Sequence, residues 1–206
     1  MSEQVVLLND LVARHQTDEL LALAMDNAAR GLSEMLGRTI TIDVPRVQTV
    51  PISRVTDHVG GPETDMVGVY LLIEGEMPGQ AILMATLEDA LRLVDLLMGE
   101  PEGTTRELGD LERSALAEAG NLTVSFFLNA LANSIGLSSR PSPPAVMVDM
   151  LGAIMGVVAA PVAAFADELL IVETAFKEPH RTVNVHFWVL PYPVMTLDQV
   201  ALATGD

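Results

Sequence analysis

The feature that most constrains the fold is an internal repetition at an offset of 99 residues. Four identities fall in matching local contexts at this offset: Glu19 with Glu118, Leu32 with Leu131, Gly37 with Gly136, and Pro45 with Pro144. A repeat of this kind indicates two copies of one supersecondary unit, which bury their apolar faces together. We therefore expect a single domain over residues 1–206, with internal repeats at about 11–99 and 110–206.

Local patterns predict the same order of elements in each half, namely helix, strand, helix and hairpin. The first half is expected to begin with a helix at 17–36 and a strand at 39–44 that Pro45 ends. A short helix at 51–59, a hairpin of 66–73 with 80–85 and a helix at 87–98 are expected to follow. The second half is expected to form a helix at 110–135, a strand at 145–148 after a Ser/Pro-rich turn at 138–144, a helix at 149–165 and a hairpin of 169–176 with 183–190, followed by a short helix near Thr196. Since an isolated hairpin is only marginally stable, the strands should pool into one largely antiparallel sheet covered by long helices. This is an α+β fold with pseudo-twofold symmetry.

Capping residues mark the expected helix ends. Thr86 and Asp110 are suited to cap the starts of the helices that follow them, because short polar side chains accept hydrogen bonds from free backbone N–H groups. Gly37, Gly99 and Gly136 are placed to end helices in the left-handed conformation that glycine adopts without strain.

Composition excludes several classes of partner and chemistry. With 28 acidic and 11 basic residues, the formal net charge is −17, which repels nucleic acid and anionic membrane surfaces. The absence of cysteine excludes disulfides, thiolate catalysis and Cys-ligated metals. The apolar stretch at 145–165 is interrupted by Asp149, Gly152, Gly156 and Pro161, so we expect a buried core segment and no membrane insertion. No signal peptide is recognised, and the cytoplasm is the expected compartment.

The basic residues are almost all arginine. Lys177 is the single lysine of the chain. Two explanations stand side by side: the acidic, lysine-poor composition of proteins from salt-loving organisms, and a GC-rich genome that favours arginine codons.

One polar stripe stands out on the predicted helix at 110–135. At about 100° per residue, one narrow face collects Ser114, Glu118, Asn121, Ser125 and Asn129, and the opposite side collects Leu116, Val124, Phe127 and Leu131. By itself such a stripe is what any amphipathic helix carries. The four histidines show no metal-ligand spacing, and we expect no metal site.

The polar stripe indicates a particular family when it is taken together with the neighbouring sequence. The spacing of Ser114, Glu118, Asn121 and Pro144, the segment LSEMLGRTITIDVPRV from Leu32, and the segment PPAVMVDMLGAIMG from Pro143 resemble the CheC, CheX and FliY family of chemotaxis phosphatases. The resemblance runs from about residue 11 to residue 191 and includes the internal duplication.

The resemblance implies an enzyme that hydrolyses the phospho-aspartate of the response regulator CheY. Glu118 would engage a basic side chain of the regulator, and the Asn121 amide would position the attacking water. Mg²⁺ would be held by the regulator, so the chain would need no cofactor of its own. The first copy departs from the pattern, because Glu19 is kept while Ala22 stands at the asparagine position. We therefore expect one working site.

Two other functions remain open from the sequence. CheC-type proteins also pair with the receptor deamidase CheD, so the chain is alternatively a CheD-binding adaptor with little or no phosphatase activity. Without the resemblance, the pattern also fits a ligand-sensing α+β domain.

Overall fold

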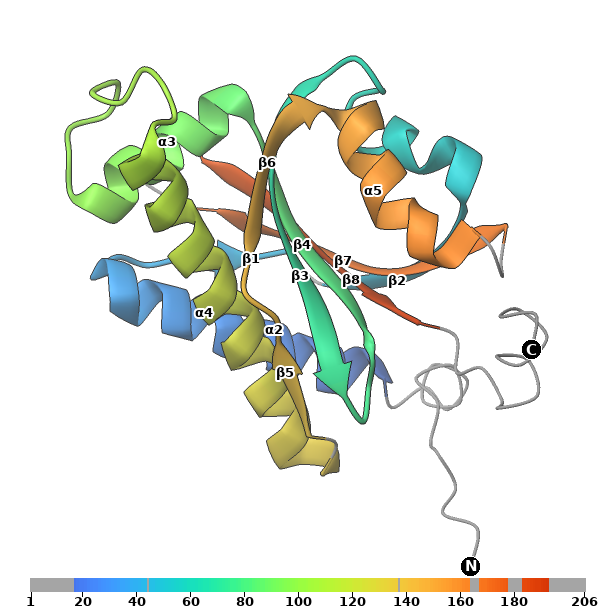
Figure 1. Cartoon of the computed structure of the whole chain (residues 1–206). Coiled ribbons are helices and arrows are strands. Elements are labelled where there is room, and N and C mark those ends of the chain that lie inside the picture. The colour runs from blue at the N-terminus through green and yellow to red at the C-terminus, as the bar shows by residue number, and fades with distance from the viewer. Residues whose placement is uncertain (1–16, 44, 137, 164–166, 178–182, 193–206) are drawn as a thin grey trace, which may run out of the picture.

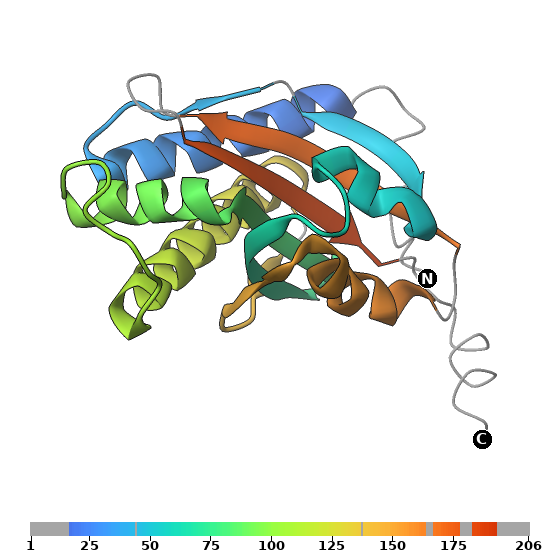
Figure 2. The same ribbon diagram turned by 90° about the horizontal axis from the view of Figure 1, so that it is seen from above.

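The structure is a computed structural model that describes residues 17–43, 45–136, 138–163, 167–177 and 183–192. Its centre is an eight-stranded antiparallel sheet with helices on both faces (Figures 1 and 2). Helices α2 (Thr17–Leu36), α3 (Leu87–Met98) and α4 (Asp110–Ile135) cover one face. The 3₁₀ helix η1 (Ile52–Val59) and helix α5 (Leu151–Ala163) cover the other. The expected α+β class is confirmed.

The helix-end signals are largely confirmed. The Thr86 hydroxyl accepts a hydrogen bond from the Asp89 N–H at 3.1 Å, and the glycines after α3 and α4 take φ values of 72° and 75°. The expectation that Asp110 caps α4 is wrong. Gly109 is the N-cap and makes no side-chain hydrogen bond, while Asp110 is the first helical residue, where its negative charge is favourable to the helix dipole.

The sheet is built from strands of both halves. They are β1 (Thr41–Ile42), β2 (Arg46–Pro51), β3 (Asp65–Gly75), β4 (Gly79–Thr86), β5 (Ser139–Pro141), β6 (Ala145–Met150), β7 (Glu168–Lys177) and β8 (Asn184–Pro191). The strand order is β1-β7-β8-β4-β3-β5, with β2 also on β7 and β6 also on β3. Each half thus pairs its edge strand with the hairpin of the other half, and both core clusters, one on each face of the sheet, contain residues of both halves.

Two strand predictions need correction. Pro45 does not end the first strand region: β1 contains only Thr41–Ile42, and the chain resumes at Arg46 as β2, which pairs with β7 over six residues. The Ser/Pro-rich segment before β6 contains β5 and is not only a turn. Both segments lie at edges of the sheet, where proline is tolerated because only one side of the strand needs hydrogen bonds.

Both faces of the central strands are buried. In β8, Phe187 and Val189 pack toward α2, α3 and α4, while Trp188 and Leu190 pack toward α5 and η1. Since a strand covered on both faces needs apolar side chains at every position, this explains the continuous apolar runs in the sequence. The expected helix at 51–59 is the 3₁₀ helix η1, and the one at 149–165 is α5, which begins two residues later than expected; residues 164 and 165 lie outside the described residues. The helix expected near Thr196 lies outside the described residues.

Helix α4 is long and apolar enough by composition to cross a membrane, and it is the single described helix that meets this test. Half of its most apolar window is buried inside the molecule. Its apolar residues pack on α2 and the sheet, as expected for the core helix of a globular domain.

Candidate functional site

The predicted polar stripe lies on the outer side of α4. Ser114, Glu118 and Asn129 are exposed, and Asn121 and Ser125 are half-buried. The opposite side is buried, as expected: Leu116, Val124, Phe127 and Leu131 are at most 3% exposed. The periodicity of the sequence therefore predicted correctly which face of α4 meets solvent.

Glu118 and Asn121 lie one turn apart on this outer face. Among the described residues, neither side chain has a hydrogen-bond or ion-pair partner. A carboxylate and an amide without internal partners keep their full capacity to bind another molecule. The pair is therefore a candidate recognition and catalytic site, exposed to a macromolecule and not enclosed in a pocket.

The backbone of α4 is held by close contacts with two neighbouring elements. A Cβ atom added to Gly31 of α2 would overlap with the ring of Phe126, and one added to Gly120 would lie 2.5 Å from Val69 of β3. Phe127 also packs edge-to-face on Phe187, with ring centroids 5.6 Å apart. These contacts fix α4 against both α2 and the sheet.

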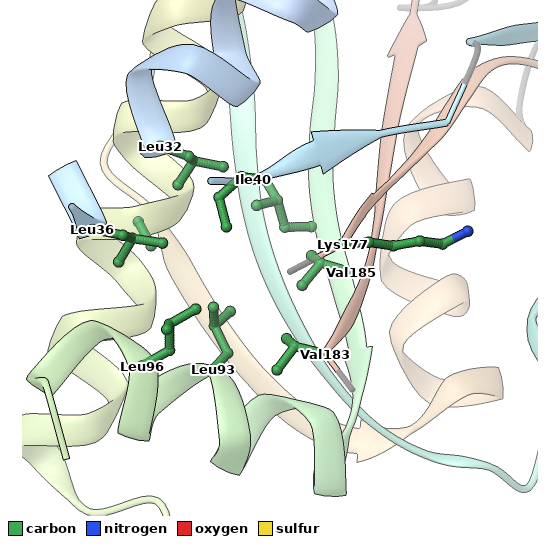
Figure 3. A pocket seen from close by; sticks show the side chains of 10 residues that line it. Leu32, Leu36, Ile40, Leu93, Leu96, Lys177, Val183 and Val185 are labelled. Atoms are coloured by element: carbon green, nitrogen blue, oxygen red, sulfur yellow. The ribbon is translucent and has the colours of Figure 1, made fainter. Parts of the chain in front are cut away.

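A small apolar cavity lies between α2, α3 and the sheet (Figure 3), and Ala119, the residue after Glu118, is part of its lining. Its volume is about 30 Å³, and Leu32, Leu36, Leu93, Val185 and Ala119 are among its lining residues. The ammonium group of Lys177 points away from it and pairs with Asp43 at 2.7 Å. This space is too small for an organic substrate. Any substrate of the site is therefore expected to bind on the outer surface of α4.

An open polar groove lies between α2 and α4, beyond the C-terminal end of the stripe. It has a volume of about 340 Å³, and its lining includes Asn27, Arg30, Glu34, Asn129 and Asn133. No motif of the sequence indicates this groove, although polar residues recur at helical spacing on α2. Only Asn129 belongs to both the stripe and the groove, so the groove is separate from Glu118 and Asn121.

The corresponding region of the first copy lies elsewhere on the molecule. Ala22 is half-buried near the start of α2. Glu19 lies in the first turns of the same helix, but its side chain is not among those described. Ala119, next to Glu118, shares a cavity with Leu36 at the end of α2, and Leu36 lies about 21 Å along the helix axis from Ala22. The structure does not bring the two regions together.

Known proteins resemble this chain both in sequence and in fold. The sequence model of the CheC-like family matches residues 111–148, which include the whole outer stripe. The CheY-P phosphatase CheC of Bacillus subtilis is 27% identical over 169 residues, which are 80% of this chain and 81% of that protein. Crystallised Thermotoga maritima FliY superposes with a TM-score of 0.69 at 22% identity and covers 93% of both chains.

A further solved relative of the fold is the CheX of a CheX–CheY–BeF₃–Mg²⁺ complex from Borrelia burgdorferi. It has a TM-score of 0.56 and 18% identity, and the match covers 82% of this chain and 96% of that one. The chain is thus similar to the CheC-like family in sequence over residues 111–148, and it shares the fold of the FliY and CheX structures.

Proposed function

We propose that this protein terminates chemotaxis signalling by hydrolysing the phospho-aspartate of a CheY-type response regulator, with Asn121 and Glu118 as the working residues. The observation that carries the proposal is the partner-free amide and carboxylate one turn apart on the outer face of a rigidly packed helix. The proposal is supported by the name of the Bacillus subtilis relative, a CheY-P phosphatase, and by the CheX that was crystallised with CheY.

Asn121 is the proposed catalytic residue. Its amide both donates and accepts hydrogen bonds and does not titrate near neutral pH, so it can hold a water molecule and contact a phosphoryl oxygen together. The oxygen of that water attacks phosphorus, the bond from phosphorus to the aspartyl oxygen breaks, and the products are inorganic phosphate and the free aspartate. An acyl phosphate is already activated, so positioning of water and fixed dipoles suffice.

Glu118 is the proposed docking residue. Its exposed carboxylate is suited to pair with a basic side chain of the regulator and to orient the regulator's phosphorylated face toward Asn121. We further propose that this is the only working site, because Ala22 has no amide group at the position that corresponds to Asn121.

We propose that Mg²⁺ is brought by the regulator, where it offsets the charge on the phosphoryl oxygens. Within the described ranges, no group of three or more His, Asp or Glu side chains is arranged to hold a metal ion. The contribution proposed for this chain is therefore the position of Asn121 and the orientation of water.

We also propose CheD as a binding partner and the cytoplasm as the compartment of this protein. The strong negative charge of the chain favours encounter with a partner of opposite charge, so a CheD complex should weaken as salt rises. A titration with the cognate CheD that detects no complex would remove CheD as a partner. The cytoplasm is proposed because the phosphorylated regulator is the substrate.

The proposal is tested by phosphate release from the cognate phosphorylated CheY. We expect Asn121→Ala to lose at least about 100-fold in rate, as is found when a positioned catalytic amide is removed. The fold should be kept, because alanine is a better helix former than asparagine. Asn129→Ala is the matched control: it is the same substitution on the same stripe, two turns away, and should leave the rate unchanged. Near-wild-type turnover by Asn121→Ala would contradict the mechanism.

A further inference from the structure

We infer that Gly120 is a positioning residue for Asn121, which acts by letting the backbone of α4 rest directly on Val69 of strand β3. This inference rests on the proposed function. Gly120 lies on the buried side of α4, between Glu118 and Asn121 in sequence. It touches neither substrate nor water and would act only through the placement of the helix.

The contact between α4 and β3 leaves no room for a side chain at residue 120. A Cβ atom there would lie 2.5 Å from Val69 Cγ1 and 3.1 Å from Val69 Cβ. Rotation of the valine side chain relieves the first contact only, because the Cβ atom stays in place whichever rotamer is adopted. Any larger residue at 120 therefore has to displace either the helix or the strand.

Of helix α4 and strand β3, the strand is the harder one to displace. Val69 lies opposite Leu83 of β4 on one side and opposite Val146 of β6 on the other, so β3 is hydrogen-bonded along both edges. Val69 is 5% exposed and part of the core between the sheet and the helices. A side chain at residue 120 is thus expected to push α4 outward.

The space between α4 and the sheet next to this contact is small. Two small apolar cavities, of about 30 and 20 Å³, are lined in part by Ala119, and Gly120 also borders the smaller one. The two cavities share Ala119, Leu93 and Val185 in their lining and so adjoin each other. At residue 120 itself the backbone of α4 meets Val69 directly, so a side chain there is not accommodated without movement.

Outward movement of the turn carries the Asn121 amide with it. With Val69 in its present rotamer, relief of the 2.5 Å contact to an ordinary van der Waals distance requires about 1 Å of movement. A misplacement of about 1 Å at a catalytic group can cost about 100-fold in rate. Docking should change little, because Glu118 is an exposed side chain that can adjust its rotamer.

The test compares kcat and KM for phospho-CheY hydrolysis in four variants. We expect Gly120→Ala to lower kcat by about 10- to 100-fold with KM within about threefold of the wild type. Val69→Ala alone should keep kcat. The double variant V69A/G120A should recover most of the loss but stay a few-fold below V69A, because the 3.1 Å contact with the remaining Cβ persists.

Gly156→Ala in α5 is the matched control, because a Cβ atom at this helical glycine meets nothing within 4 Å. It should leave both kinetic constants unchanged. Circular dichroism spectra of all variants, recorded well below their melting temperatures, check that they are folded.

Each outcome decides the inference. A folded Gly120→Ala with wild-type kcat overturns it, and so does a folded, impaired Gly120→Ala that Val69→Ala fails to rescue. If Gly120→Ala does not fold, the double variant decides: kcat below that of V69A at equal KM supports the inference, and equal kcat overturns it. Failure of the proposed function is a different result, since the wild-type protein itself would then show no hydrolysis.

Discussion

Glu118 and Asn121 differ in exposure although they lie one turn apart on the same helix. Asn121 is half-buried, and partial burial reduces the number of rotamers open to its side chain. Glu118 is exposed and can reach outward to a partner. This difference matches the two proposed roles, one in orienting water and one in docking.

Glu118→Ala is expected to raise KM about fivefold at nearly unchanged kcat. An exposed ion pair contributes at most about 1 kcal/mol, which corresponds to that factor. Steady-state hydrolysis of phospho-CheY measures both constants. Glu19→Ala is the matched control on α2, and the one-site proposal expects it to behave as the wild type. If Glu19→Ala alone abolished turnover, the one-site proposal would be wrong.

At the scale of elements, a buried carboxylate anchors the loop that leads into α4. Asp95 of α3 is fully buried and accepts hydrogen bonds from the Gly103 N–H at 2.7 Å and the Thr105 N–H at 2.8 Å. Arg92, one turn earlier, reaches Glu102 of the same loop at 3.3 Å. The last residue of α3 and the first of α4 are thus connected by a loop of defined shape.

The hydrogen bonds to Asp95 link the stability of this loop to pH. Burial raises the pKa of Asp95, but the bonds from Thr105, Gly103 and Thr104 outweigh burial, so the pKa falls below its ordinary value of 3.8. A lowered pKa means that the folded state favours the carboxylate. Its contribution to stability is therefore complete above the ordinary pKa and is lost as pH falls through the lowered pKa of the folded state.

Asp95→Asn is expected to lower the free energy of unfolding by about 1 to 3 kcal/mol at neutral pH, because an amide has one acceptor oxygen for the two backbone donors. Urea titrations at several pH values between 7 and 3 measure this loss. The difference between wild type and variant should shrink at the acidic end, where the unfolded chain takes up a proton on Asp95 before the folded protein does. A difference that stays constant with pH would contradict the linkage.

At the scale of the whole molecule, negative charge exceeds what ion pairs can neutralise. The formal net charge is −17, and several of the described ion pairs, such as Arg30 with Asp26, are exposed. Repulsion among the remaining carboxylates opposes the compact state. Salt weakens that repulsion, because the Debye length falls from about 30 Å at 0.01 M to about 3 Å at 1 M ionic strength.

The melting temperature is therefore expected to rise markedly between dilute buffer and molar KCl. The rise should exceed that of a near-neutral protein of similar size, which responds only through the general effect of salt on apolar burial. Thermal unfolding followed by circular dichroism gives the measurement, and an equal concentration of a neutral osmolyte serves as control. A melting temperature that does not change with KCl would leave the salt-loving explanation of the composition without support.

The sequence by itself determined the features whose hydrogen bonds and periodicity are local. The bounds of α2 and α3, the ends of α3 and α4 at Gly99 and Gly136, and both hairpins were predictable because capping and alternation act over a few residues. The outer stripe with Glu118 and Asn121 was predictable for the same reason. Its proposed chemistry came from the family resemblance and not from periodicity.

Other features of the fold were decided only by the tertiary structure, because they depend on contacts between distant parts of the chain. Strand β2 lies between Pro45 and Pro51, which read locally as breaks, and it is a strand of the sheet because β7 pairs with it from more than 100 positions away. The exchange of edge strands between the halves has no local signal. The contact of Gly120 with Val69 likewise has none, since a glycine in a helical pattern does not reveal what lies opposite it. Non-local pairing and close packing are fixed by the whole fold, and these decide where the Glu118–Asn121 turn sits.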